Sequence, residues 1–220
     1  MSNSLVFLEP NKIDTIPFTT SKVISEWVGI EHRKLKISIR KHQSALETFG
    51  RIGLIVSASY GAETSVGRPE ESYQLNEQQA TLLITFLKNT PIVVKFKTEL
   101  VKQFYLMRTE LLKRQVNREQ LKPIRRELTD VIQEKEPDNK WAYKLYTDLA
   151  YKAGVGKNAA QIRKDRNAGK KAVAVDYMTA NEIERISKLQ SQIAVLKEMG
   201  MEYQQIKALV LEGKLIGKIA

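Results

Sequence analysis

Residues 19–46 read TTSKVISEWVGIEHRKLKISIRKHQSAL, and this stretch decides the expected fold of the N-terminal part. It predicts two helices joined by a tight turn at Gly29, because glycine adopts the left-handed conformation that such a corner needs. Thr20 or Ser21 can cap the first helix by accepting a hydrogen bond from a free backbone N–H. Ser25 is small enough to let the second helix cross closely. A short helix, a glycine corner and a second helix are typical of a helix-turn-helix.

The second helix, expected over residues 31–46, carries most of the positive charge of this stretch and both histidines of the chain. Ile30, Leu35 and Ile39 are placed to pack back against the first helix. The candidate DNA-contacting side chains of the helix are His32, Arg33, Lys34, Lys36, Arg40 and Lys41. A basic second helix in such a pair indicates a helix that enters a DNA groove. The alternative is the solvated basic face of an ordinary amphipathic helix.

The composition agrees with an anionic partner but does not identify it. The chain has 220 residues, enough for two small domains, and a formal net charge of +11, which favours nucleic acid or an acidic protein. It has no cysteine, which excludes disulfides and cysteine-based zinc sites and fits a reducing cytoplasm. The start of the chain lacks the pattern of a signal peptide, and no apolar run reaches the roughly 20 residues that span a bilayer. We therefore expect a protein of the cytoplasm without a membrane partner.

Two strands are expected after the basic helix. The segment FGRIGLIVSASY, residues 49–60, is rich in strand formers, and a turn-forming loop separates it from residues 72–75. These segments predict a β hairpin, or wing, and residues 5–8 suggest a further edge strand. Arg51 and Arg68 lie in the expected hairpin, where they either reach DNA phosphates or serve as solubilising surface residues.

Long helices are expected next. Asn76 caps a helix over residues 77–88, and Thr90 with Pro91 starts another that runs from Ile92 to about Val116. The second of these helices has an apolar stripe, which predicts either a dimer seam or packing on the preceding domain. The stripe consists of Val93, Leu100, Phe104, Met107 and Leu111.

The C-terminal part is expected to be all-helical. After a connector over residues 118–138, in which Pro123 starts a short helix, Trp141, Leu145 and Leu149 predict one apolar stripe. Further on, a capping box of Thr179 and Glu182 begins a strong helix. The expected fold class is therefore α+β and mostly α. The expected domains are a winged helix-turn-helix-like domain with trailing helices over 1–117, the connector over 118–138 and an all-α domain over 139–220.

A second basic zone lies in this C-terminal part. Its cations are Lys157, Arg163, Lys164, Arg166, Lys170 and Lys171, interrupted only by Asp165. Three interpretations stay open for it. It contacts phosphates, it grips an acidic partner protein, or it is a solvated helix face.

Catalytic and cofactor sites are not expected. The stretch GVGKN, residues 154–158, lacks the first glycine and the hydroxyl residue of a Walker phosphate-binding loop. His32 and His42 are ten residues apart and would point to different faces of one helix, which disfavours a histidine metal site. No cluster of acid, base and nucleophile stands out. We therefore expect no cofactor, no metal and no enzymatic activity.

Part of the chain resembles a known family. Residues 20–40, the expected hairpin and YQLNEQQATLLITFLKNTPIVVKFKTELVKQF, residues 73–104, resemble the phage regulatory protein Rha family. Residues 146–167 and the later DYMTANEIERI and IAVLKEMGMEYQQIKALV are similar to the small helical C-terminal domain of phage antirepressor-like proteins. The resemblance implies a phage or prophage regulator that acts in a bacterial cytoplasm.

Two functions follow as hypotheses. In the first, the protein binds double-stranded DNA through the winged helix-turn-helix, and a homodimer would suit a two-fold symmetric site. In the second, the protein is an antirepressor that binds a phage or host repressor through its C-terminal domain.

Overall fold

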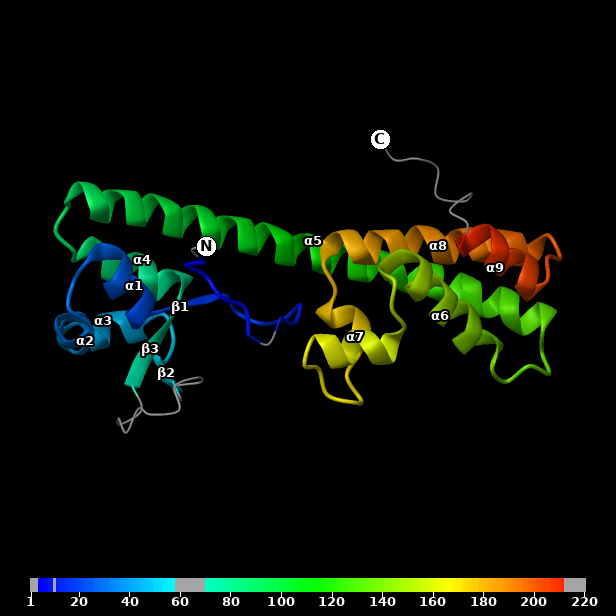
Figure 1. Ribbon diagram of the computed structural model, residues 1–220, viewed down its shortest axis with the longest axis horizontal. Coiled ribbons are helices and arrows are strands. Elements are labelled where there is room, and N and C mark those ends of the chain that lie inside the picture. The colour runs from blue at the N-terminus through cyan, green and yellow to red at the C-terminus, as the bar shows by residue number, and fades with distance from the viewer. Residues whose placement is uncertain (1–3, 10, 58–69, 212–220) are drawn as a thin grey trace, which may run out of the picture. The chain divides into compact units, whose positions relative to one another are not determined.

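The computed structural model describes residues 4–9, 11–57 and 70–211 (Figure 1). The chain forms two compact units. Unit 1 comprises Met1–Glu9 and Thr15–Thr109, and unit 2 comprises Pro10–Asp14 and Glu110–Ala220. Most described residues are helical, and the small antiparallel sheet lies in unit 1, so the fold class is α+β.

The sheet of unit 1 has three strands. They are β1 (Phe18–Thr20), β2 (Gly53–Ser57) and β3 (Glu70–Asn76), and β3 lies in the middle with antiparallel partners on both sides. The predicted antiparallel pairing of the two hairpin strands is thus confirmed. The sequence did not predict β1, because its two threonines also suit the cap of the next helix. Residues 5–8 form no named strand, only the bridge between Phe7 and Phe18.

Four shorter helices are described in unit 1 beside the sheet (Figure 1). They are α1 (Ser21–Val28), α2 (His32–Lys41), α3 (Gln43–Glu47) and α4 (Glu77–Thr85). The predicted second helix is therefore shorter than expected: α2 ends at Lys41, and α3 follows after His42. His42 has the non-helical angles φ −108° and ψ 17°, and its ring stacks on Phe86 with centroids 4.1 Å apart. A tertiary contact therefore accompanies this break.

The long helix α5 (Pro91–Lys135) contributes residues to both units. Its start is as predicted, since the Val93 N–H donates to the Thr90 hydroxyl. Its length is not: the predicted break and separate connector helix are wrong, because the helix continues through Pro123. Pro123 has no backbone N–H, so the carbonyl of Glu119, four residues earlier, loses its helical hydrogen bond. Both residues lie on the exposed side of the helix, where water can bond to this carbonyl instead. Leu121 and Leu128 on the opposite side are buried and keep the helix against its core.

The first half of α5 packs within unit 1. The predicted stripe residues Val93, Leu100 and Phe104 are buried in the main apolar cluster of that unit, and Met107 packs against it. A buried side chain cannot also form a seam with a second chain. Of the two predictions for this stripe, the structure therefore bears out packing on the preceding domain. The cluster also contains Ile24, Leu35, Ile39, Leu46, Leu75, Leu83 and Phe96.

The regular elements of unit 2 that the structure describes are all helices. It contains the end of α5, α6 (Ala142–Val155), α7 (Ala159–Asp165), the short 3-10 helix η1 (Ala174–Tyr177), α8 (Ala180–Glu198) and α9 (Tyr203–Leu211). The capping box of Thr179 and Glu182 at the start of α8 is confirmed. The stripe predicted for α6 is wrong in part. Trp141 and Leu145 are exposed, and the buried residues of this helix include Ala142, Tyr146 and Leu149.

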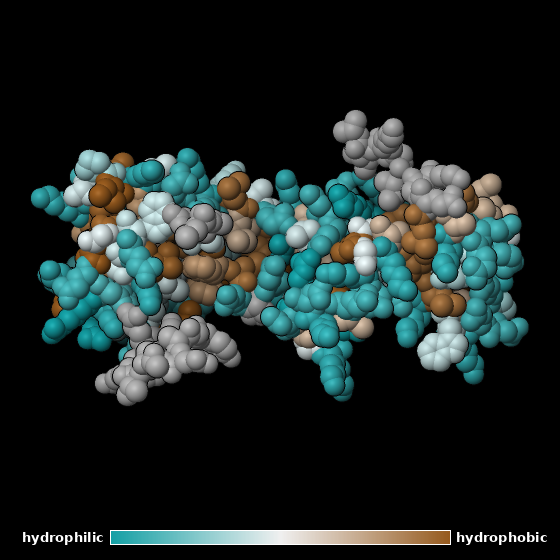
Figure 2. All heavy atoms as spheres, in the orientation of Figure 1, coloured by the Kyte–Doolittle hydropathy of each residue, from teal (hydrophilic) through white to brown (hydrophobic). Residues whose placement is uncertain are grey.

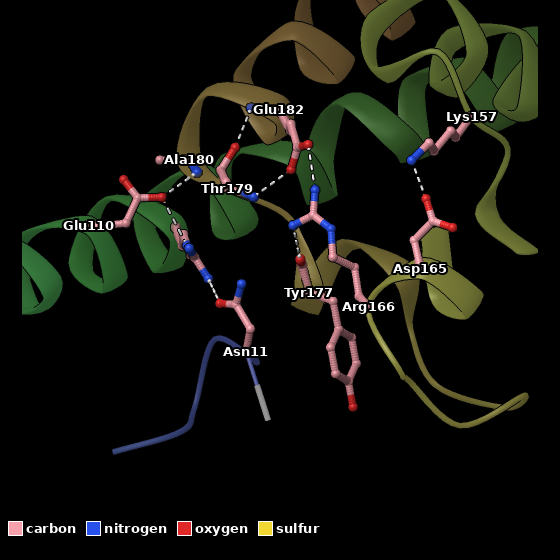
Figure 3. A network of polar contacts seen from close by, with 10 residues as sticks. Asn11, Glu110, Lys157, Asp165, Arg166, Tyr177, Thr179, Ala180 and Glu182 are labelled. Atoms are coloured by element: carbon pink, nitrogen blue, oxygen red, sulfur yellow. Dashed lines mark hydrogen bonds and ion pairs between the residues drawn. The ribbon is translucent and has the colours of Figure 1, made fainter. Parts of the chain in front are cut away.

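Charged side chains hold parts of unit 2 together (Figure 3). Glu110 of α5 accepts hydrogen bonds from the backbone N–H of Ala180 and from Arg114, both at 2.9 Å. Arg114 also donates to Asn11 at 2.7 Å, and the Ile13 N–H donates to the backbone carbonyl of Asp176 at 2.8 Å. The short N-terminal segment of unit 2 is therefore fastened by polar contacts to α5 and η1.

No helix among the described residues is long and apolar enough to cross a membrane.

Candidate nucleic-acid interface

The corner between α1 and α2 is built as the sequence predicts. The Thr20 side chain caps α1 by accepting from the Val23 N–H, and Gly29 follows the helix at φ 69°. The backbone N–H groups of Gly29 and Ile30 both donate to the carbonyl of Ser25, which satisfies the end of α1. This local geometry sends the chain directly into α2.

The helix α2 has one apolar face and one cationic face. Leu35 and Ile39 are about 1% exposed and belong to the core of unit 1. The exposed cations of the helix are Arg33, Lys34, Arg40 and Lys41. Figure 2 shows that the surface around α2 and α3 is largely hydrophilic. The structure therefore brings four of the predicted contact residues together on one accessible surface, which we call the α2 surface.

Two hydrogen bonds join α2 to the central strand of the sheet. Lys36 donates to the backbone carbonyl of Glu71 at 3.3 Å, and the Arg40 Nε donates to the Tyr73 hydroxyl at 3.0 Å. The bond to Tyr73 raises the pKa of the Arg40 guanidinium above its ordinary value, so the side chain stays charged. Lys36 is half-buried at the flank of the helix, whereas Arg33 and Lys41 make no hydrogen bond or ion pair with any residue that the structure describes.

His32, at the first turn of α2, is part of a polar cluster. Its Nε2 lies 2.9 Å from the Ser21 hydroxyl, which in turn lies 3.1 Å from the Ser72 hydroxyl. The Tyr73 N–H donates to Ser21, and the Lys22 N–H donates to Ser72. Both serines are buried, so the cluster ties the start of α1 and the start of α2 to β3. The structure thus places His32 in a packed contact beside the α2 surface.

The hairpin contributes one described cation. Arg51 is exposed just before β2. The turn that precedes it is fixed by two side chains of the α4 cap: Asn76 donates to the carbonyl of Phe49 and Gln79 donates to the carbonyl of Gly50. Arg68, the other predicted phosphate contact, lies outside the described residues. Arg51 is therefore held at a defined place beside the sheet.

The second basic zone of the sequence divides into two groups in unit 2 (Figure 3). Lys157 pairs with Asp165, and Arg166 donates to Glu182 at 2.7 Å and to the backbone carbonyl of Tyr177 at 3.0 Å. These contacts use the two cations to hold α7 in place. The remaining cations form no ion pair with the described residues and are half-exposed or exposed, and we call them the α7 surface. They are Arg163, Lys164, Lys170 and Lys171.

The sequence did not predict one residue of the α2 surface. Ile37 is 54% exposed in the middle of the cationic face, although an isoleucine in an amphipathic helix is ordinarily assigned to the core. Its spacing from Leu35 and Ile39 was the available signal, because a residue two positions from each of two core residues points away from them at 3.6 residues per turn.

No metal site is found in the part of the chain that the structure describes. That part holds no group of three or more His, Asp or Glu side chains that could bind a metal ion.

The comparisons with known proteins concern unit 1. No curated protein matches the chain. Residues 19–109 match the family model described as phage regulatory protein Rha, a range that contains α1 to α4, β2, β3, the last two residues of β1 and the first part of α5. The resemblance that the sequence showed for its N-terminal part is therefore confirmed, and it supports a phage regulatory role, whereas the similarity of the C-terminal part to antirepressors stays a prediction.

Proposed function

We propose that the protein is a phage or prophage transcriptional regulator that binds double-stranded DNA through a winged helix-turn-helix. Its reading helix would be α2, and its wing would be the hairpin of β2 and β3. The observation that carries the proposal is the α2 surface: four exposed cations on the helix that follows the Gly29 corner, within the residues that match a regulator family.

The proposed binding mode follows from the sizes and charges of these elements. A helix of ten residues fits the major groove of B-DNA, where arginine and lysine reach phosphates and guanine edges. Lys36 and Arg40 are bonded to β3, so α2 would enter the groove as a preset element. Arg51 would contact the flanking backbone. The protein would act by binding rather than by catalysis, on DNA in the cytoplasm of a bacterial host.

The first test removes two cations of the α2 surface. Arg33→Ala with Lys41→Ala takes away side chains that have no partner among the described residues, so the fold should be unaffected. We expect affinity for duplex DNA to fall at least tenfold, and the slope of log affinity against log salt to decrease by about 2. Fluorescence anisotropy at several salt concentrations measures both quantities.

A matched control separates a site from a general charge effect. Lys113→Ala with Arg126→Ala removes the same charge from exposed positions of α5 in unit 2. If the control weakens DNA binding as much as the α2 variant does, the attraction comes from net charge alone. If neither the wild type nor the variants bind duplex DNA at low salt, the proposed function is wrong.

We also propose that the regulator binds DNA as a dimer, on half-sites about one helical turn apart. The part of α5 in unit 1 supports this with a second, exposed apolar face. Val94, Val101 and Tyr105 are between 49% and 68% exposed, and their spacing of seven and four residues places them on one side of the helix. Sedimentation velocity of the free protein tests the proposal, since a single monomeric species at micromolar concentration would contradict it.

The second candidate function, an antirepressor, has an observation of its own in unit 2. Trp141 is 66% exposed beside the exposed Leu145, with the Lys144 ammonium 5.6 Å from the indole centroid. Exposed tryptophan is enriched among residues that dominate protein interfaces. In this alternative, the full-length protein captures a repressor. The Trp141→Ala variant should lose this capture, and the variant with Arg33→Ala and Lys41→Ala should keep it. Capture of no repressor by the wild-type protein would favour DNA binding alone.

A further inference from the structure

Ile37 occupies the centre of the α2 surface. At 3.6 residues per turn it lies about 160° around the helix from each of the buried residues Leu35 and Ile39. All ten residues of α2 are described, and its other apolar side chains are these two, so Ile37 is the one apolar side chain on the outward face. Its side chain is 54% exposed.

Cations surround this isoleucine on both sides. Arg33, Lys34, Arg40 and Lys41 each lie within about 60° of Ile37 around the helix axis, three or four residues away along the chain. A single exposed isoleucine is ordinary on a protein surface. An isoleucine placed between four cations of a DNA-reading helix is different, because the cations would bring it against the floor of the groove.

The chemistry of the groove then limits what Ile37 can recognise. The edges of guanine, cytosine and adenine present hydrogen-bonding groups in the major groove, and thymine adds a C5-methyl group. An isoleucine has no donor or acceptor, so it gains contact only with that methyl. Its β-branched side chain is stiff and loses little freedom on binding.

We infer that Ile37 is a specificity-determining residue that contacts a thymine methyl group in the DNA target. The inference rests on the proposed function and adds to it the base that the helix selects. The flanking cations would supply affinity for any sequence, and Ile37 would make binding depend on thymine at one position of each half-site.

The test replaces thymine with deoxyuridine, which lacks only the methyl group. A target obtained by selection from random duplexes is synthesised with each thymine replaced in turn. Wild-type protein should bind about fourfold more weakly at the contacted position, the loss expected for one buried methyl group. For Ile37→Ala the ratio of the two affinities should approach one, whereas Ile37→Val should retain most of the discrimination. Val195→Ala, an exposed apolar truncation on α8, should discriminate like the wild type.

The outcomes separate this inference from the proposed function. If wild-type protein binds a selected target but tolerates deoxyuridine at every thymine, or if the selected target has no thymine, the inference is wrong and DNA binding stands. If Ile37→Ala keeps its circular dichroism spectrum and still discriminates the methyl group, another residue reads it and the inference is also wrong. If no duplex is bound at low salt, the proposed function itself fails.

Discussion

Gly29 shows how one residue sets the direction of the reading helix. Its φ of 69° lies in the left-handed region, and among the described residues no heavy atom beyond the adjoining backbone lies within 4 Å of the place where a Cβ would be. A substitution there would meet no steric clash with neighbouring elements. Its cost would therefore come from the backbone torsion alone, which makes the position a clean test of the corner.

We predict that Gly29→Ala lowers the free energy of unfolding of unit 1 by about 1 kcal/mol, the torsional cost of a left-handed alanine. Gly29→Asn should cost less, because asparagine tolerates this conformation better than alanine. Urea unfolding followed by circular dichroism measures both values. Equal stability of the alanine variant and the wild type would show that the corner can relax without strain.

At this scale the sequence predicted local features well and burial less well. The caps at Thr20, Asn76 and Thr179 depend on residues three positions away, so their patterns are visible in the chain itself. The exposure of Ile37 and Trp141 depends on which neighbouring element covers each face. Periodicity assigns an apolar residue to a stripe but cannot tell whether anything packs against it.

At the scale of elements, a buried ion pair joins Glu136, the residue that follows α5, to Lys197 of α8 in unit 2. The Lys197 ammonium lies 2.7 Å from Glu136, and its side chain is only 4% exposed. Glu136 also accepts hydrogen bonds from the Tyr146 hydroxyl and from Asn139. Burial alone would raise the pKa of Glu136, but these bonds and the charge of Lys197 outweigh it and lower the pKa below its ordinary value of 4.5.

The sign of this shift gives a prediction for acid. A carboxylate whose pKa is lower in the folded state stabilises the fold above its unfolded pKa, and the contribution disappears as the pH falls through the folded pKa. We expect Glu136→Gln to lower the free energy of unfolding at pH 7 by about 3 kcal/mol, since it leaves Lys197 buried without its counterion. The variant should also lose less stability than the wild type between pH 5 and about pH 3.

Glu134→Gln is the control for this prediction, because Glu134 is exposed and pairs only with Lys135 among the described residues. Its unfolding at pH 7 should match that of the wild type. A Glu136→Gln protein with unchanged stability at pH 7 and an unchanged acid limb would show that the pair makes no net contribution.

The continuity of α5 is the element that the sequence least revealed. Proline ordinarily ends a helix, so Pro123 predicted a new start. The helix continues because Leu121 and Leu128 are both buried on its inner side and because Pro123 faces outward. Tertiary packing overrode a local stop signal. The strand β1 was missed for a related reason, since three residues become a strand only beside β3.

At the scale of the whole molecule, the formal net charge of +11 means that cations outnumber carboxylates, and the α2 surface and the α7 surface hold eight of the exposed or half-exposed cations. We predict that the α7 surface also contacts phosphates. Changing Arg163, Lys164, Lys170 and Lys171 to Gln should reduce the salt slope of DNA binding by about 0.9 for each contact that is lost.

The effect of the α7 variant on different DNA sequences makes this prediction specific. The α7 variant should lose affinity for all sequences alike, because phosphate contacts carry no sequence information. An unchanged salt slope would instead assign these four residues to solvent or to an acidic partner protein. The sequence alone left these interpretations open, because it could not show that Lys157 and Arg166 are used within the fold.

The bond between Arg40 and Tyr73 has a consequence for the thermodynamics of recognition. It uses the Arg40 Nε, and Arg40 forms no other hydrogen bond with the described residues, so both terminal nitrogens remain available for a bidentate contact. A long side chain ordinarily loses its rotational freedom when it docks. Arg40 has already lost much of that freedom in the free protein. Its contact with DNA should therefore carry a small entropic penalty, and a lysine at this position, lacking the Nε, would have to be ordered anew at each encounter.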